Sequence, residues 1–360
     1  MKPKPLPDPN SSIGELSPVA FWNSVSRKTE TSRALTEATV ELTYGCNLRC
    51  VHCYNPTHLA KKEELSSEKI ISIFKQLHEE ECLSLILTGG EMFTRRDFFE
   101  LLKSAKEEGF AVALKTNGTF VTEAVANRLS SLLPLQCDVS LYGATKETYE
   151  KVTGVPGSFA KCISGIERCI DRKIPVTLMI PAMTLNLEEV AKMQAMAKAW
   201  GIRAVTSAVL HPKSDGSLKP LAYRLDPEKA AQLLQGPLPL VYHTPPQKEK
   251  GGPRRWRGRM NCRAAQNSCA ITPYGEMNFC VSFPFPKYNL LTGTVHEGWR
   301  TLLEWFDSRA KEERSDEKAV HPFYSGCPRD GWGEAGSFDA PVPYYEALAL
   351  EEEKLRRAPP

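Results

Sequence analysis

From about residue 38 onward, short β-rich runs alternate with amphipathic helical segments, and this alternation constrains the fold more than any other feature. Apolar residues in the segments between the runs recur with helical spacing, as Ile70, Phe74 and Leu77 do. The six β-rich runs cover 38–45, 83–90, 110–118, 135–143, 174–183 and 202–212. Successive strand–helix units predict a parallel sheet with helices outside it. Six units are too few for a closed eight-fold barrel, so we predict an α/β fold, a partial (β/α)6 TIM-like barrel.

The rest of the chain differs from this core in composition. A Pro- and Ser-rich start precedes the core, and a stretch rich in Pro, Gly and basic residues follows it. A cysteine-rich region comes next, with a hairpin predicted to turn at Pro273-Tyr274-Gly275 and a helix near 297–314. The predicted segments are an arm at 1–37, the core at 38–235, a linker at 236–261, a small domain at 262–345 and a tail at 346–360, with a last helix over 343–357.

Charge and hydropathy exclude several classes of partner. The net charge of +3 is small for 360 residues, so we expect neither nucleic acid nor a membrane surface as a partner. We find no secretory signal and no apolar run long enough to span a bilayer, which predicts a cytoplasmic protein. In that reducing compartment, eleven cysteines are better explained as metal ligands, catalytic thiols or core residues than as disulfides.

Three of these cysteines, Cys46, Cys50 and Cys53, lie close together in the loop after the first predicted strand. A structural zinc site needs four protein ligands, and three thiolates are one short. A [4Fe-4S] cluster held by three thiolates leaves one iron open to a bidentate small molecule. We therefore predict such a cluster, and a zinc site completed by His52 or His58 is the alternative.

The C-x3-C-x2-C spacing resembles the signature of the radical S-adenosylmethionine (radical SAM) superfamily. His52 occupies the position of the family's aromatic residue before the last cysteine, and Tyr54 follows that cysteine. The resemblance implies that the open iron binds the amino and carboxylate groups of SAM. It also implies that an electron from an external donor cleaves SAM to methionine and a 5′-deoxyadenosyl radical, which abstracts hydrogen from the substrate.

Other predicted strand ends resemble the same superfamily. Gly89-Gly90-Glu91 matches its GGE element, which holds the methionine amino group, although Met92 replaces the usual Pro. Lys115-Thr116-Asn117-Gly118 ends the third strand, and the fourth carries a polar residue where the family often contacts SAM. The SAM contacts implied by the resemblance are His52, Tyr54, Gly89, Gly90, Glu91, Asn117 and Ser140.

The run from Cys262 through Gly275 to Cys280 resembles the start of a SPASM/twitch domain, an auxiliary-cluster module of many radical SAM enzymes. Cys327 aligns with the last cysteine of a later block whose other cysteines are missing. The resemblance implies one auxiliary [4Fe-4S] cluster, in a twitch-like domain, ligated by Cys262, Cys269, Cys280 and Cys327. A structural zinc site with the same ligands is the alternative.

Four other cysteines are predicted to fill the core. Cys162 and Cys169 share one face of a helix, Cys137 lies within a strand, and Cys82 begins another.

The segment 139–159, VSLYGATKETYEKVTGVPGSF, together with the auxiliary module, resembles the corresponding parts of radical SAM peptide maturases. These enzymes act on ribosomally synthesised precursor peptides. They form crosslinks in them, epimerise their residues or excise part of their backbone. The implied partners are a precursor peptide and, because the arm is too short for a winged helix, a separate leader-recognition protein. Basic linker residues could instead hold an acidic leader, or form a solvated linker: Lys248, Lys250, Arg254, Arg255, Arg257 and Arg259, with Trp256 among them.

Two other functions stay open. One is a twitch-type oxidoreductase acting on an alcohol of a sugar-like small molecule. The other is a non-enzymatic zinc or Fe–S scaffold protein. Tyr142, Lys115 and His211 are candidate acids or bases, and each also has an ordinary structural explanation.

Overall fold

The computed structural model describes residues 32–234, 267–283, 285–310, 327–337, 340 and 342–357. The predicted linker, Cys262 and most of the predicted arm lie outside these residues. Within them, we find no helix that is both long and apolar enough to cross a membrane.

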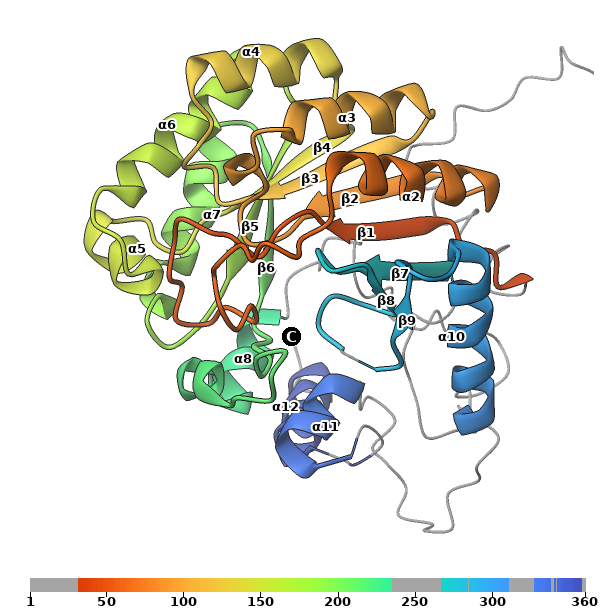
Figure 1. Cartoon of the computed structure of the whole chain (residues 1–360). Helices are drawn as coiled ribbons and strands as arrows, with labels where there is room; N and C mark the ends of the chain where they lie inside the picture. The colour runs from red at the N-terminus through yellow and green to blue at the C-terminus, as the bar shows by residue number, and fades with distance from the viewer. Residues whose placement is uncertain are drawn as a thin grey trace, which may run out of the picture.

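Six parallel strands form the core of the fold and confirm the predicted α/β partial barrel (Figure 1). The parallel strands lie in the order β6-β5-β4-β3-β2-β1 within a larger nine-stranded sheet. Their bounds are β1 Glu37–Glu41, β2 Ser84–Thr88, β3 Ala111–Thr116, β4 Gln136–Ser140, β5 Val176–Pro181 and β6 Arg203–Ser207. Five of these six strands lie within their predicted β-rich runs. The sixth, β1, begins one residue earlier than predicted, at Glu37.

Helices cover the outer face of the sheet through apolar residues at helical spacing. In α2, the side chains of Ile70, Phe74 and Leu77 are buried as predicted. The helix bounds are α2 Ser67–Glu79, α3 Phe98–Glu107, α4 Glu123–Leu132, α5 Lys146–Thr153, α6 Ser158–Asp171, α7 Val190–Ala199 and α8 Pro227–Leu234. Cys82, Cys137, Cys162 and Cys169 are buried in this core, as predicted.

The sequence analysis did not predict α5. Thr145 caps its start by accepting a hydrogen bond from the Thr148 amide, and Gly154 ends it in the left-handed conformation. The helix is short, and it buries Tyr149 and Val152 against the core. Such a brief apolar stripe is too weak to recognise by periodicity alone.

The C-terminal region extends the sheet beyond β1 and confirms the predicted hairpin. β7 (Ser268–Ile271) pairs parallel to β1, and β8 (Glu276–Asn278) and β9 (Tyr288–Asn289) continue antiparallel. The hairpin turn ends at Gly275, whose φ of 79° favours glycine. α10 (Val295–Ala310) packs beside α2, and its bounds lie close to those of the helix predicted near 297–314. Figure 1 shows α11 (Pro328–Ala335) and α12 (Pro343–Arg357, as predicted) between α8 and the β8–β9 ribbon.

Asn186 joins the carboxyl ends of β4 and β5. Its side-chain amide donates to the carbonyls of Tyr142 and Pro181, both at 3.0 Å, and its oxygen accepts from the Met183 amide at 2.8 Å. The side chain is 1% exposed, so water cannot replace these partners.

Replacing Asn186 by Ala should therefore lower the free energy of unfolding by about 2 to 3 kcal/mol, because buried backbone groups lose their partners. Urea denaturation of the purified chain measures the change. Asn127→Ala is the matched control, since Asn127 is exposed and its partner is Arg172. A loss of less than about 0.5 kcal/mol for Asn186→Ala would contradict the structural role.

Candidate active site

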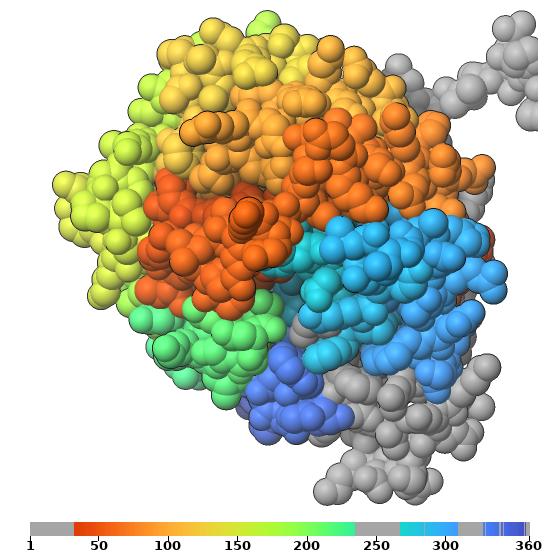
Figure 2. Space-filling model, viewed as in Figure 1, coloured from red at the N-terminus to blue at the C-terminus, as the bar shows by residue number. Residues whose placement is uncertain are grey.

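The loop between β1 and α2 carries Cys46, Cys50 and Cys53 at the carboxyl edge of the barrel. It docks on the last turn of α5, where the Arg49 amide donates to the carbonyl of Thr153 at 2.8 Å. On the face shown in Figure 2, the red-orange loop borders the green region near α8 and the teal β-ribbon. The predicted triplet therefore lies where the barrel core meets the C-terminal region.

The three thiols lie near one another, since Cys53 and Cys46 both act on Cys50. Burial raises the pKa of Cys53 to about 11 and the pKa of Cys50 well above its ordinary value. Bare thiolates are thus disfavoured, whereas a metal cation can displace the protons and balance the charge. The Leu48 amide and the Asn117 side chain point at Cys46 Sγ, at 3.4 and 4.0 Å. These donors suit an anionic sulfur, so the residues present fit a thiolate-ligated cluster.

Gly89 and Gly90 let the end of β2 pack against the backbone of this loop. A Cβ atom on Gly90 would lie 2.4 Å from the Gly45 carbonyl oxygen, and one on Gly89 would lie 2.3 Å from that of Thr43. The Gly90 amide donates to the Thr43 carbonyl at 2.7 Å. Any side chain here would push the cysteine loop away. Their contact with SAM stays a prediction.

Glu91 is more enclosed than a ligand-facing carboxylate. It is 1% exposed, and it accepts hydrogen bonds from the Thr116 hydroxyl, the Asn117 amide and the Phe93 amide. Burial raises its pKa to about 7, although these donors oppose the shift. The side chain therefore ties β2 to β3, and its predicted contact with the methionine amino group stays a prediction.

Of the other predicted SAM contacts, His52 lies within the cysteine loop and Asn117 borders it. Asn117 donates to the Asn47 side chain at 3.0 Å. The His52 ring lies 4.9 Å from that of Tyr142, and its buried Nδ1 has no hydrogen-bond partner among the described residues. Burial lowers the pKa of His52 to about 4, so its imidazole is neutral. Ser140 ends β4, at the same edge of the sheet.

The sequence analysis missed Glu41, the last residue of β1. Its carboxylate is 1% exposed and accepts hydrogen bonds from the hydroxyls of Tyr54 at 2.6 Å and Tyr44 at 3.3 Å. Tyr54, predicted to contact SAM, therefore already has a partner. Burial raises the pKa of Glu41 to about 7, against the two tyrosines and the charge of Arg329. The signal available in the sequence was an acidic residue in the first predicted strand, shortly before the cysteine triplet.

The predicted auxiliary cysteines lie in different surroundings. Cys280 and Cys327 both lie near Arg329: burial lowers the pKa of that guanidinium, and Asp330, Cys327 and Cys280 oppose the shift. The guanidinium lies 5.8 Å from the centre of the Tyr54 ring. Cys269 instead pairs with the core residue Ala38 and is 2% exposed. Cys262 lies outside the described residues. The four-thiolate cluster therefore stays a prediction, and the structure places Cys269 within the hydrophobic core.

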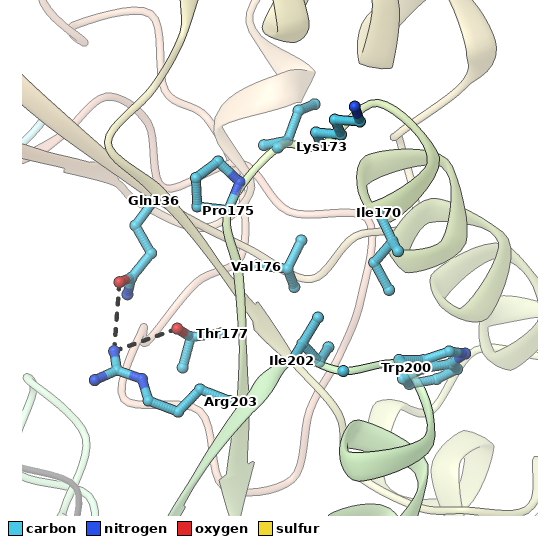
Figure 3. Close-up of a pocket in the computed structure, with 11 residues that line it drawn as sticks. Gln136, Ile170, Lys173, Pro175, Val176, Thr177, Trp200, Ile202 and Arg203 are labelled. Carbon is cyan, nitrogen blue, oxygen red and sulfur yellow. Dashed lines mark hydrogen bonds between the residues drawn. The ribbon is translucent and has the colours of Figure 1, made fainter.

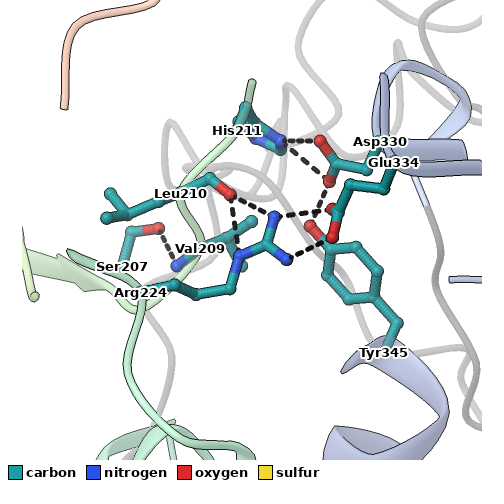
Figure 4. A network of polar contacts seen from close by, with 8 residues as sticks. All are labelled: Ser207, Val209, Leu210, His211, Arg224, Asp330, Glu334 and Tyr345. Atoms are coloured by element: carbon teal, nitrogen blue, oxygen red, sulfur yellow. Dashed lines mark hydrogen bonds and ion pairs between the residues drawn. The ribbon is translucent and has the colours of Figure 1, made fainter. Parts of the chain in front are cut away.

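A polar network joins the end of the barrel to α11 and α12 (Figure 4). His211 Nδ1 lies 2.9 Å from Asp330 Oδ1, and the Tyr345 hydroxyl donates to Asp330. Arg224 forms a two-pronged ion pair with Glu334, at 2.9 and 2.8 Å. Burial would raise the pKa of Asp330, but His211 and the other partners outweigh it and lower the pKa.

The three candidate acids or bases thus all have structural neighbours. Lys115 Nζ lies 4.0 Å from Asp138 inside the barrel, and Tyr142 packs against His52. His211 is paired with Asp330, and its loop contacts the cysteine loop through the Ser214 amide.

One pocket of about 320 Å³ lies at the opposite end of the barrel (Figure 3). It opens at the amino ends of β5 and β6, beside Trp200, where Arg203 donates to Gln136 and Thr177 at 3.3 Å. In parallel α/β sheets, chemistry lies at the carboxyl ends of the strands, so this pocket is separate from the cysteine site.

The family model for the Radical SAM superfamily matches residues 40–197. The AdoMet-dependent heme synthase of Methanosarcina barkeri is 34% identical over 177 residues, which are 49% of this chain and 51% of that relative. A probable GTP 3′,8-cyclase of Saccharolobus islandicus is 32% identical over 188 residues, which are 52% of this chain and 60% of that relative. The chain thus spans only about half of the length of these curated relatives.

Similar solved structures cover more of the chain. SuiB of Streptococcus suis, bound to S-adenosylmethionine, has a TM-score of 0.62 at 14% identity over 81% of this chain and 74% of that chain. The native protein anSMEcpe with bound AdoMet has a TM-score of 0.59 at 16% identity over 88% and 95% of the two chains. At these identities, the likeness concerns the fold.

Replacing Gly90 by Ala should displace the cysteine loop, because the new methyl group has no space beside the Gly45 carbonyl. We expect a loss of about 3 kcal/mol in the free energy of unfolding, and little iron bound after reconstitution. Gly109→Ala is the control. Nothing lies within 4 Å of the Cβ added at Gly109, so this substitution leaves the cysteine loop in place, and its φ of 89° should cost only about 1 to 2 kcal/mol of stability. Iron content equal to that of the unmodified chain would show that the close approach is unimportant.

The raised pKa of Glu91 predicts a pH-dependent stability. A carboxyl group with a pKa of about 7 in the folded chain, against 4.5 for the ordinary group, stabilises the fold below pH 4.5. That contribution, about 3 kcal/mol, is lost as the pH rises through 7. Urea unfolding from pH 4.5 to 8 should show a smaller decline for Glu91→Gln, which has no proton to lose. Glu100→Gln, at an exposed position of α3, should keep the original decline. Equal slopes for all three proteins would exclude a raised pKa.

Proposed function

We propose that this chain, a radical SAM enzyme, abstracts a hydrogen atom from a ribosomally synthesised precursor peptide and thereby crosslinks it, epimerises it or excises backbone from it. The enzyme class rests on the cysteine triplet at the carboxyl edge of the barrel and on the superfamily match over residues 40–197. The peptide substrate rests on the fold as a whole.

The chain's own residues hold and position the reacting partners. Cys46, Cys50 and Cys53 would ligate a [4Fe-4S] cluster, which supplies the electron that splits SAM into methionine and a 5′-deoxyadenosyl radical. Gly89 and Gly90 keep the ligand loop against β2. The three cysteines are half-buried, which would limit the water that meets a reactive radical.

The extent of the structural likeness is the single observation that favours a peptide. The alignments with SuiB and anSMEcpe cover 81% and 88% of this chain, whereas the curated relatives match about half of it. SuiB has also been solved with its precursor peptide SuiA, and anSMEcpe with the Kp18Cys peptide. A shared architecture around the barrel mouth supports a substrate of similar size and shape.

Sequence identity favours a second candidate, a small molecule. About half of the chain is 34% identical to a heme synthase and 32% identical to a probable GTP cyclase, both named for small-molecule products or substrates. A substrate of this kind would bind at the same strand ends. In either case we propose an external electron donor and an auxiliary metal group in the C-terminal region. A separate leader-recognition protein applies only to the peptide.

The proposal predicts SAM cleavage that depends on the triplet. After anaerobic reconstitution with iron and sulfide, the reduced chain should form 5′-deoxyadenosine from SAM. Replacing Cys46, Cys50 and Cys53 by Ala should abolish the product, because the cluster loses its ligands. Cys82→Ala is the matched control, since Cys82 is buried in the core. Product formation by the triple variant would refute the assignment of the cluster.

The substrate class is tested in the same assay with deuterated candidates. A perdeuterated precursor peptide should transfer deuterium into 5′-deoxyadenosine, which mass spectrometry detects as a heavier product. Transfer from a tetrapyrrole or nucleotide, with none from the peptide, would favour the small-molecule candidate. An iron-loaded chain that forms no 5′-deoxyadenosine with any candidate would point to a scaffold.

A further inference from the structure

Arg329 is a buried cation at the start of α11. Its side chain is 0% exposed, and among the described residues Nε and both terminal nitrogens find no hydrogen-bond acceptor. A buried guanidinium without such acceptors is costly, so it needs anionic groups nearby. Among its neighbours, Asp330 acts on its charge most strongly, followed by Cys327 and Cys280. Thiolates of these two cysteines bound to a metal would add to the negative charge, which makes this place suitable for a metal group.

An imidazole and a carboxylate lie close to the Cys327 thiol. One ligand atom each from His211, Cys327 and Asp330 lies within 4.8 Å of the others. Sulfur and imidazole nitrogen are ligands that both zinc and iron accept in proteins. The cluster joins the loop after β6 to the start of α11, segments far apart in the sequence.

The pairing of His211 with Asp330 matches the way in which metal proteins orient a ligating histidine. His211 Nδ1 lies 2.9 and 3.0 Å from the two carboxylate oxygens of Asp330, which is 0% exposed. Tyr345 donates to the same carboxylate, so the orienting group is itself held (Figure 4). A carboxylate on one ring nitrogen leaves the other nitrogen free to bind a metal.

Cys269 lies in a different place. In β7 it pairs with Ala38, and both side chains are part of the hydrophobic core. Burial raises the pKa of its thiol, and the charged neighbours that act on it are Cys82 and Glu37, at the start of the sheet. It therefore has the surroundings of a core residue.

We propose that His211 is a ligand of the auxiliary metal group together with Cys280 and Cys327, that Asp330 and Tyr345 orient its ring, and that Cys269 is not a ligand. The inference rests on the proposed function only in requiring an auxiliary metal group, and it is independent of the substrate. It applies to an iron–sulfur cluster or to zinc, because both accept thiolate and imidazole ligands. For a cluster, a neutral imidazole in place of a thiolate raises the reduction potential.

The test isolates the auxiliary group. Cys46, Cys50 and Cys53 are replaced by Ala in the full chain, which is then reconstituted anaerobically with iron and sulfide or, in parallel, with zinc. Metal analysis distinguishes the two metals. For iron, pulsed electron paramagnetic resonance of the reduced sample should detect a ¹⁴N coupling from a ligating imidazole. For zinc, X-ray absorption should detect a mixed sulfur and nitrogen shell.

Three variants in this background decide the ligand. His211→Leu should lose most of the metal, or keep it without the nitrogen signal. His211→Cys should keep the metal, lose the nitrogen signal and, for a cluster, lower the potential. Cys269→Val should change none of these. His296→Leu is the matched control, because His296 is exposed on α10 and pairs with Glu80.

The parent is the chain in which only Cys46, Cys50 and Cys53 are replaced by Ala. If it binds metal without any nitrogen signal, the inference is overturned. Metal content and nitrogen signal that are unchanged in His211→Leu would overturn it as well. Loss of metal in Cys269→Val, with circular dichroism unchanged, would do the same. No metal binding at all in the parent would also overturn it. SAM cleavage by the unmodified chain is measured separately, so this inference can fail while the enzyme class stands.

Discussion

The close approach of Gly89 and Gly90 to the backbone of residues 43–45 is the constraint on which the candidate site depends. It lets the end of β2 lie directly against the cysteine loop, with amide-to-carbonyl hydrogen bonds in place of side chains. Glu91 follows at once and binds the end of β3 through Thr116 and Asn117. Three consecutive strand ends and the ligand loop thus form one packed unit, which gives the thiols fixed positions before any metal binds.

The C-terminal helices close the other side of this site through buried polar contacts. Arg224 and Glu334 form a two-pronged ion pair, and Asp330 joins the loop after β6 to α11 and α12. Charges in such surroundings favour one arrangement strongly, because any other leaves a charge buried without a partner. Arg329 makes no side-chain hydrogen bond among the described residues, and the nearby charges of Asp330, Cys327 and Cys280 act on it.

About half of the chain resembles a heme synthase and a probable GTP cyclase in sequence, whereas a larger part resembles SuiB and anSMEcpe in fold. The sequence relatives match about half of the chain, and the superfamily model matches residues 40–197 of the barrel. The fold likeness to SuiB and anSMEcpe covers most of the chain. In folds of this kind, residues at strand ends carry the chemistry, while the segments around them vary between proteins.

The sequence by itself determined the barrel, the cysteine triplet, the hairpin and the last helix, because these depend on local periodicity and spacing. Cys82, Cys137, Cys162 and Cys169 were placed in the core for the same reason. Only the tertiary structure could show that Glu91 is enclosed, that Cys269 pairs with Ala38 in neighbouring strands, and that His211 contacts Asp330, 119 positions away. Contacts between distant segments depend on how the sheet and helices pack, and no local pattern of residues records that packing.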